Sequence, residues 1–265
     1  MIRRASAIEY RGLAEHGRNQ PIKALVETDA GDLLEVYVKP SGRPELGIEG
    51  LANELFAACI AGELGLPVCE PVIVELDPDW IATIPQPGLR HVLADSSPLA
   101  FGSLSLGDAW RIWSAGDRAV GVRRQTALGI FAFDAFTAND DRRLAKPNLL
   151  VRGDEMRMID HELCFRLRLK FFPPCAAWQL GNLGHLASAE RHNFGPVLKG
   201  DRFLDIGALR ARWVALSNDC LEDYGAVLPA EWAEAERPIA DAIAHLKSVR
   251  DRIDECLDEL RRVLA

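Results

Sequence analysis

The stretch NLLVRGDEMRMID, residues 148–160, constrains the fold of this chain more than any other part of its sequence. Two short runs rich in apolar residues flank Arg-Gly-Asp-Glu, which predicts a β-hairpin that turns over these four residues. Antiparallel pairing then places Asn148 opposite Ile159, so that Asn148 and Asp160 lie side by side. An amide oxygen and a carboxylate brought together suit Mg²⁺, which completes its octahedral coordination with phosphate oxygens and water. We therefore expect Asn148 and Asp160 to bind a metal ion.

Another carboxylate, Asp141, precedes this hairpin, in the turn after a helix that the apolar stripe of residues 122–138 predicts. A carboxylate in such a turn can accept a proton from a hydroxyl group. The order of base, amide and carboxylate along the chain is that of the catalytic half of a kinase-type phosphotransferase. We predict that Asp141 is the catalytic base of such an enzyme.

The other half of such a site is expected upstream, where nucleotide phosphates need positive charge. Lys39 ends the strand LLEVYVK, and Glu54 on the following helix can pair with Lys39 and hold it in place. The segment EHGRNQPIK offers backbone N–H groups and a guanidinium for phosphates. Its candidate phosphate-binding residues are Gly17, Arg18, Asn19 and Gln20. Each element alone is weak, since a strand-ending lysine is usually a solvated edge residue. The order and spacing of all of them together favour a nucleotide site.

The first third of the chain predicts strands around one helix. IKALVETDAGDLLEVYVKP alternates apolar and polar residues on both sides of an Ala-Gly-Asp turn, which indicates a β-hairpin. Residues 48–64 space their apolar side chains as a helix does, and Gly65 with Pro67 ends it. PVIVEL and DWIATIP predict two more short strands, and the turn-rich QPGLRHVLADSSPLAFGS predicts a connection between two lobes.

The remainder of the chain is expected to be mostly helical. Apolar residues recur every three or four positions from Ile239 to Leu264, which predicts one C-terminal helix that packs on the core. Together these elements predict an α+β, two-lobed protein-kinase-like fold. A small, β-rich N-lobe with one helix is expected over residues 1–86, a connector over 87–103, and a larger, mainly helical C-lobe with the catalytic hairpin over 104–265.

Composition narrows the class of protein. A formal net charge of −8 over 265 residues argues against a nucleic-acid partner, which usually requires a basic surface, and against an anionic membrane. The six cysteines form no CxxC pair, which favours reduced thiols over a zinc site or a disulfide framework. The start of the sequence lacks a signal-peptide pattern and no segment is apolar enough to span a membrane, so a cytoplasmic protein is expected.

Several motifs give the sequence a family resemblance. YRGLAEHGRNQPIKALVE, VYVKP, NELFAACIAGELGLPV, FDAFTANDDR, NLLV and MIDHELCF resemble the HipA-like kinases, a bacterial branch of the protein-kinase-like fold. The resemblance covers residues 8–165 best and implies ATP- and magnesium-dependent phosphoryl transfer, commonly to a Ser or Thr hydroxyl on a protein. It implies Asp141 as the base, Asp160 as the metal ligand at the DFG-like position, Lys39 at the phosphates and Glu54 as its partner. Gly17 to Gln20 would form the phosphate loop, and His161 stands where ordinary protein kinases have Phe.

One position departs from the kinase pattern. Kinases place a metal-binding Asn five residues after the catalytic Asp, and here Lys146 stands there, with Asn148 two residues further on. Three interpretations stay open. Asn148 takes over the ligand role, one metal site is weakened, or the Lys146 ammonium substitutes for metal charge near a phosphate.

The sequence thus predicts an ATP- and Mg²⁺-dependent kinase, with a protein hydroxyl as acceptor favoured over a small molecule. The first alternative is a pseudokinase or nucleotide-binding regulatory module, which Lys146 supports. The second is a small-molecule kinase of the aminoglycoside or choline type. In a further alternative, NDDRR is only a solvated turn. The convergence of Asn148 and Asp160 would then be a coincidence. The acceptor and the oligomeric state are not predicted.

Overall fold

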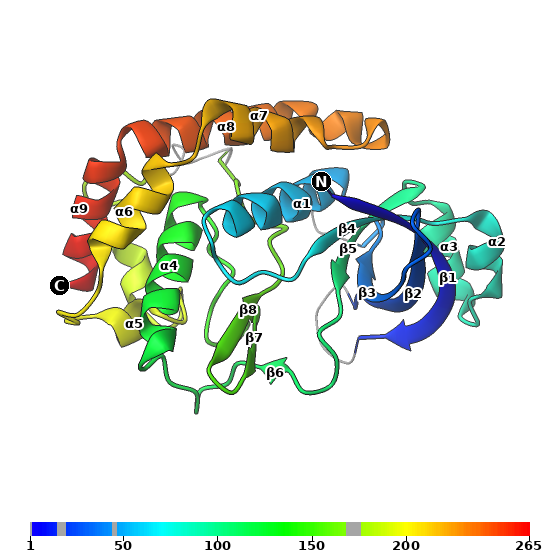
Figure 1. Cartoon of the computed structure of the whole chain (residues 1–265), viewed down its shortest axis with the longest axis horizontal. Helices are drawn as coiled ribbons and strands as arrows, with labels where there is room; N and C mark the ends of the chain where they lie inside the picture. Colours follow the sequence, from blue (N-terminus) through cyan, green and yellow to red (C-terminus); the bar gives the residue numbers. More distant parts are fainter. Residues whose placement is uncertain (1, 15–19, 44–46, 168–175) are drawn as a thin grey trace.

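The first part of the chain forms a closed β-barrel, and helices make up most of the second part (Figure 1). The structure is a computed structural model that describes residues 2–14, 20–43, 47–167 and 176–265. The barrel strands, in the order in which they pair, are β1 (Arg3–Leu13), β2 (Ile22–Thr28), β3 (Leu33–Lys39), β5 (Leu99–Leu104) and β4 (Pro71–Glu75). A parallel pairing of β1 with β4 closes the ring.

The predicted hairpin of β2 and β3 is confirmed. Ile22 pairs with Val38 and Val26 with Leu34, and Gly31 adopts φ 83° in the connection between the strands. Alternate residues of β2, such as Ile22 and Ala24, are fully buried because they point into the barrel. The barrel interior is therefore a hydrophobic core of its own.

Helix α1 (Ile48–Glu63) confirms the predicted helix, but it belongs to a different core from the barrel interior. Its residues from Gly50 to Ala61 are all buried, because strands β4 and β5 lie on one side of it and later helices cover the others. The helix ends where Gly65 adopts φ 67° and the Leu66 N–H donates to the Ala61 carbonyl, which is a Schellman-type termination.

Two predictions about residues 77–103 are wrong. DWIATIP is not a strand: α2 (Pro78–Thr83) begins after Asp77, whose carboxylate accepts from the Asp79 N–H at 2.7 Å. The segment 87–103 is more than a turn-rich connection, because it contains α3 (Pro87–Ala94) and most of the barrel strand β5. The β-rich part thus has helices besides the one that was expected.

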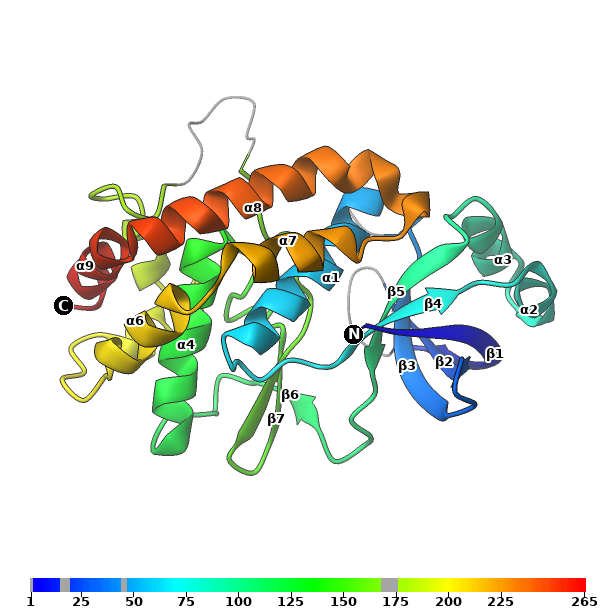
Figure 2. The ribbon, with the colours of Figure 1, turned by 45° about the horizontal axis from the view of Figure 1, so that its top comes forward.

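The second part begins with a small sheet of β6 (Arg111–Ile112), β7 (Leu149–Arg152) and β8 (Glu155–Met158), beside α4 (Val122–Phe136). The further elements are η1 (Gly184–Ala187), α5 (Gly195–Leu198), α6 (Ile206–Val214), α7 (Asn218–Ala226), η2 (Ala230–Ala235), α8 (Glu236–Asp251) and α9 (Ile253–Leu264). Helices α7 and α8 lie side by side and cover α1 (Figure 2).

The expected single C-terminal helix is two helices. Arg252 leaves helical geometry with φ −115° and ψ 29°, and α9 turns away from α8 at this residue (Figure 2). Both helices still bury the predicted apolar stripe from Ile239 to Leu264, except that Ile243 is only partly buried. Among the described helices, none combines the length and the apolar character that crossing a membrane requires.

Candidate functional site

The hairpin of β7 and β8 has the predicted register. Leu149 pairs with Met158, and the Ile159 N–H donates to the Asn148 carbonyl at 3.1 Å. Asn148 and Asp160 flank the paired strands, and both have positive φ, at 47° and 63°. Few residues other than glycine accept this conformation, and Asn and Asp are among those that do. The local backbone therefore restricts which residues these two positions tolerate.

Asp141, Asn148 and Asp160 converge on one place, as the sequence predicted. The Asn148 amide donates from Nδ2 to the Asp141 carboxylate at 3.2 Å and to its main-chain carbonyl at 3.3 Å. Lys146 joins the other two residues, because its Nζ lies 2.5 Å from Asp141 Oδ2 and 2.9 Å from Asp160 Oδ2. The residue at the departing position is thus part of the cluster.

The predicted ion pair between Lys39 and Glu54 is confirmed. Lys39 ends β3, and its Nζ contacts Glu54 Oε1, lies 2.7 Å from Asp160 Oδ1 and is 3.8 Å from Glu162 Oε2. The second oxygen of Glu54 accepts from the His161 N–H at 2.8 Å. The His161 ring packs edge-on against Phe133, and its Nδ1 lies 3.5 Å from the same Glu54 oxygen. The barrel, α1 and the hairpin therefore meet at one row of charges.

Mutual pairing sets the charge states in this row. Burial alone would lower the pKa of Lys39, but the carboxylates of Asp160, Glu54 and Glu162 outweigh it and raise the pKa above its ordinary value. Burial alone would raise the pKa of Asp160, but Lys39 and then Lys146 lower it. Glu162 differs, because burial outweighs the attraction of Lys39 and raises its pKa to about 7.

The carboxylates around Lys39 offer the hard oxygen atoms that Mg²⁺ requires. Oxygen atoms of Glu54, Asp160 and Glu162 lie within 4.8 Å of one another. This donor set fits a divalent cation once the Lys39 ammonium leaves the space between these carboxylates. Sequence reasoning missed Glu162, although its position two residues after Asp160 in IDHE is a signal that could have indicated it.

Of the four candidate phosphate-binding residues, Gly17, Arg18 and Asn19 lie outside the described residues. Gln20 is exposed, has φ 38°, and its carbonyl accepts from Arg43 Nη1 at 2.5 Å. The assignment of this segment to phosphate binding stays a prediction.

A buried polar network below the hairpin holds the cluster in place. Asp134, near the end of α4, accepts from Arg142 Nε at 2.6 Å and from Asn139 Nδ2 at 2.7 Å. His192 Nδ1 accepts from the Phe194 N–H, so its Nε2 carries the proton and donates to Asp134 at 3.0 Å. Sequence reasoning missed Asp134 and His192, which are far apart along the chain.

Arg142 connects this network to both strands of the hairpin. Its Nη1 donates to the Asn148 carbonyl and reaches the Ile159 carbonyl at 3.4 Å. Burial alone would raise the pKa of Asp134, but Arg142 and His192 outweigh it and lower the pKa. The charged and fully buried pair of Arg142 and Asp134 thus holds the backbone at Asn148 and at Ile159, the residue before Asp160.

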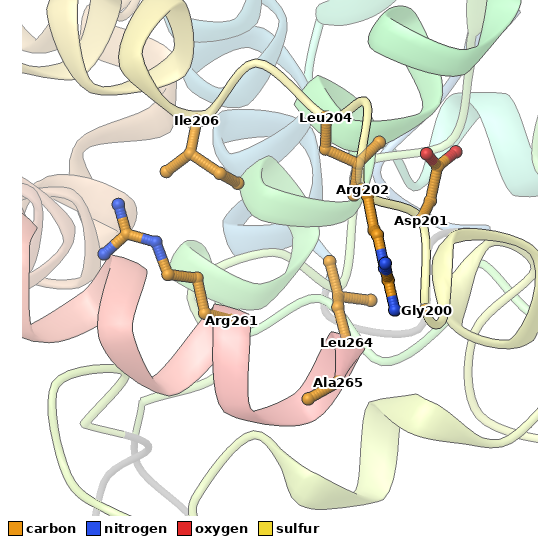
Figure 3. Close-up of a pocket in the computed structure, with 8 residues that line it drawn as sticks. All are labelled: Gly200, Asp201, Arg202, Leu204, Ile206, Arg261, Leu264 and Ala265. Carbon is orange, nitrogen blue, oxygen red and sulfur yellow. The ribbon is translucent and has the colours of Figure 1, made fainter.

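A pocket of about 370 Å³ lies elsewhere, between residues 200–206 and the end of α9 (Figure 3). Arg202, Leu204 and Arg261 are among its lining residues, and none of the predicted site residues is. The charged cluster is therefore separate from this hollow.

Comparisons with known proteins show the family of this chain. Residues 13–172, more than half of the chain, match a protein family described as HipA-like kinase. The chain belongs to the HipA-like kinase family, whose members are kinase-type phosphotransferases. A similar solved structure is that of CtkA, a proinflammatory kinase of Helicobacter pylori. It is 10% identical, with 95% of this chain and 96% of that chain covered and a TM-score of 0.49. No curated protein matches the chain.

Proposed function

We propose that this chain is a two-lobed kinase that transfers the γ-phosphoryl group of Mg·ATP to a hydroxyl group, with a Ser or Thr of a protein as the acceptor. The convergence of Asp141, Asn148 and Asp160 beside the Lys39–Glu54 pair carries this proposal. Family membership supports the reaction type. Protein acceptors are common in the family that the sequence resembles, which favours them over small molecules.

Each residue of the cluster has a role in this reaction. Asp141 accepts the proton of the attacking hydroxyl while the oxygen bonds to the γ-phosphorus and the bond to the β-phosphate oxygen breaks. Asp160 would hold magnesium with the help of Glu162 or Asn148, and magnesium supplies positive charge for the phosphate oxygens. Lys39, oriented by Glu54, exchanges its contact with Asp160 for the nucleotide phosphates.

A pseudokinase is the second candidate, and the Lys146 contact supports it. The ammonium lies 2.5 Å from Asp141 Oδ2, so a cation already occupies one side of the carboxylate that would accept the proton. A chain of this kind would bind nucleotide without transferring phosphate.

Substitutions in the cluster test the proposal. Asp160→Ala should abolish Mg²⁺-dependent ATP turnover while leaving the fold intact, because the metal loses its carboxylate. Asp141→Asn should preserve ATP binding and lower phosphoryl transfer by roughly 100-fold, as expected for loss of a general base. A large loss in Asn148→Ala supports a metal-ligand role for its amide oxygen, and no change assigns the role elsewhere. Binding is measured by calorimetry and transfer with γ-labelled ATP.

Asp154→Ala is the matched control, because Asp154 is an exposed residue in the turn of the same hairpin. It should behave as the wild type in both assays. Wild-type protein that binds Mg·ATP but transfers no phosphate to any hydroxyl would favour the pseudokinase. Wild-type protein that binds no ATP would exclude both candidates.

A further inference from the structure

Lys146 is placed between the two carboxylates that the proposed reaction needs. Its Nζ contacts Asp141 Oδ2 at 2.5 Å and Asp160 Oδ2 at 2.9 Å, and its side chain is 31% exposed. The other oxygen of Asp160, Oδ1, faces Lys39 instead. The two oxygens of the Asp160 carboxylate thus serve two different cations.

The backbone around Lys146 fixes this placement. Arg143 and Lys146 exchange a pair of main-chain hydrogen bonds, each of 3.0 Å, which form a tight turn. Pro147 follows, and its carbonyl accepts from Asn193 Nδ2 at 3.1 Å. The backbone on both sides of Lys146 is therefore held in place. From this fixed position the side chain brings its ammonium to both carboxylates.

The same space is where a second divalent cation would bind in a protein kinase. Protein kinases hold two magnesium ions, one on the carboxylate that corresponds to Asp160 and one on the amide that follows the catalytic Asp. Here a tethered ammonium already pairs with Asp141 and with one oxygen of Asp160. A divalent cation at this point would be repelled by the ammonium and would have to displace it from both carboxylates.

We infer that Lys146 replaces the second metal ion, so that the nucleotide-bound protein holds one divalent cation, on the Asp160–Glu162 side of the site. This inference rests on the proposed nucleotide binding. Lys39 leaves Asp160 Oδ1 when it moves to the phosphates, which frees that oxygen for the single cation, whereas Lys146 keeps Oδ2. The ammonium then acts as a built-in positive charge beside the transferred phosphoryl group.

Counting bound Mn²⁺ tests this inference without measuring activity. Equilibrium dialysis against Mn²⁺ and the non-hydrolysable analogue AMP-PNP, with electron paramagnetic resonance to quantify Mn²⁺, gives the number of ions per bound nucleotide. We expect one in the wild type. Lys146→Asn removes the ammonium and supplies an amide oxygen, so that this variant should bind two. Lys146→Gln offers the same oxygen on a longer side chain and is the second variant, should the first not fold by circular dichroism.

Lys199→Asn is the control, since it makes the same substitution at an exposed lysine after α5, and it should retain one ion. Two ions on the wild type would overturn the inference. One ion on a folded Lys146→Asn or Lys146→Gln variant would also overturn it, because Lys146 would not be what excludes the second cation. Failure of the wild type to bind AMP-PNP would instead overturn the proposed function, which this inference requires.

Discussion

Asp134 illustrates how one buried charge supports a site that it does not touch directly. Its carboxylate is fully buried and is paired with the equally buried Arg142, whose guanidinium also contacts carbonyls of the hairpin. Desolvation makes such a pair a poor source of net stability, but removing one partner leaves the other charge buried and unpaired. The pair therefore acts by fixing geometry, since Arg142 cannot keep its position without Asp134.

Replacing Asp134 should be strongly destabilising. We expect Asp134→Ala to lower the free energy of unfolding by about 3–5 kcal/mol, because the Arg142 guanidinium and the Nε2–H group of His192 lose their acceptor. Urea denaturation followed by circular dichroism measures this change. Asp254→Ala is the control, because that carboxylate pairs with Arg210 in solvent and should leave stability nearly unchanged. Equal midpoints for the two variants would contradict a structural role for Asp134.

At the scale of elements, the turn that carries Asp141 is connected to α9 through the loop before η1. Glu259 of α9 accepts from the Gly181 and Leu183 N–H groups at 3.0 and 3.2 Å, which anchors this loop. In η1, His185 contacts the Asn182 carbonyl through Nδ1 and Asp140 Oδ1 through Nε2, each at 3.0 Å. Both partners only accept hydrogen bonds, so the imidazole must be doubly protonated to make both contacts.

This connection should depend on pH. The hydrogen bond with Asp140 is the main reason that the pKa of His185 is raised above 6.5. A raised pKa means that the contact is fully present below pH 6.5 and is lost as the pH rises through the raised value. We expect Asp140→Asn to lower the titration midpoint of His185 in a proton NMR titration, whereas Asp154→Asn should not move it. An unchanged midpoint in Asp140→Asn would show that the pair does not form in solution.

How much of the fold and the site could be predicted from the sequence depends on how far apart along the chain the interacting residues are. The hairpin register, α1 and α4 follow from local periodicity and turn residues, and they were predicted correctly. Helix α2 was missed although Asp77 and Pro78 form a standard start signal, because its apolar residues resemble a strand. The break at Arg252 has no glycine or proline to indicate it. Asp134 and His185 act through partners that only the folded chain brings near, so residue patterns alone could not assign them.

For the whole molecule, charges at the junction connect two hydrophobic cores. One core fills the barrel, and the other runs from α1 through α4 to α9 and includes Ile73 and Phe101 of barrel strands. Lys39 of the barrel binds Glu54 of α1, and Asn53 donates from Nδ2 to the Glu162 carbonyl at 3.2 Å. Helix α1 thus links the barrel to the helical part, beside the direct contact of Lys39 with Asp160.

Removing the Glu54 carboxylate should weaken the connection between the barrel and the helical part. Glu54→Ala leaves Lys39 without its closest partner and the His161 N–H without its acceptor, so we expect a loss of roughly 3 kcal/mol in unfolding free energy. Hydrogen–deuterium exchange should increase more in β2 and β3 than in α4, because the barrel loses its attachment. Glu63→Ala, at the exposed end of the same helix, should leave both regions protected as before. Uniform exchange throughout the Glu54→Ala protein would argue for a single cooperative unit.

The parallel pairing that closes the barrel also bears on how the chain can fold as it is synthesised. Arg3 pairs with Val72, so the first strand has to wait for β4 before the ring can close, and β5 emerges later still. Helix α1 has left the ribosome by then, yet α7 and α8, which cover it, are made only after β5, α4 and the hairpin of β7 and β8. A nascent chain therefore carries an apolar helix that lacks its cover until α7 and α8 have been made, and exposed apolar surface of this kind favours aggregation during that interval.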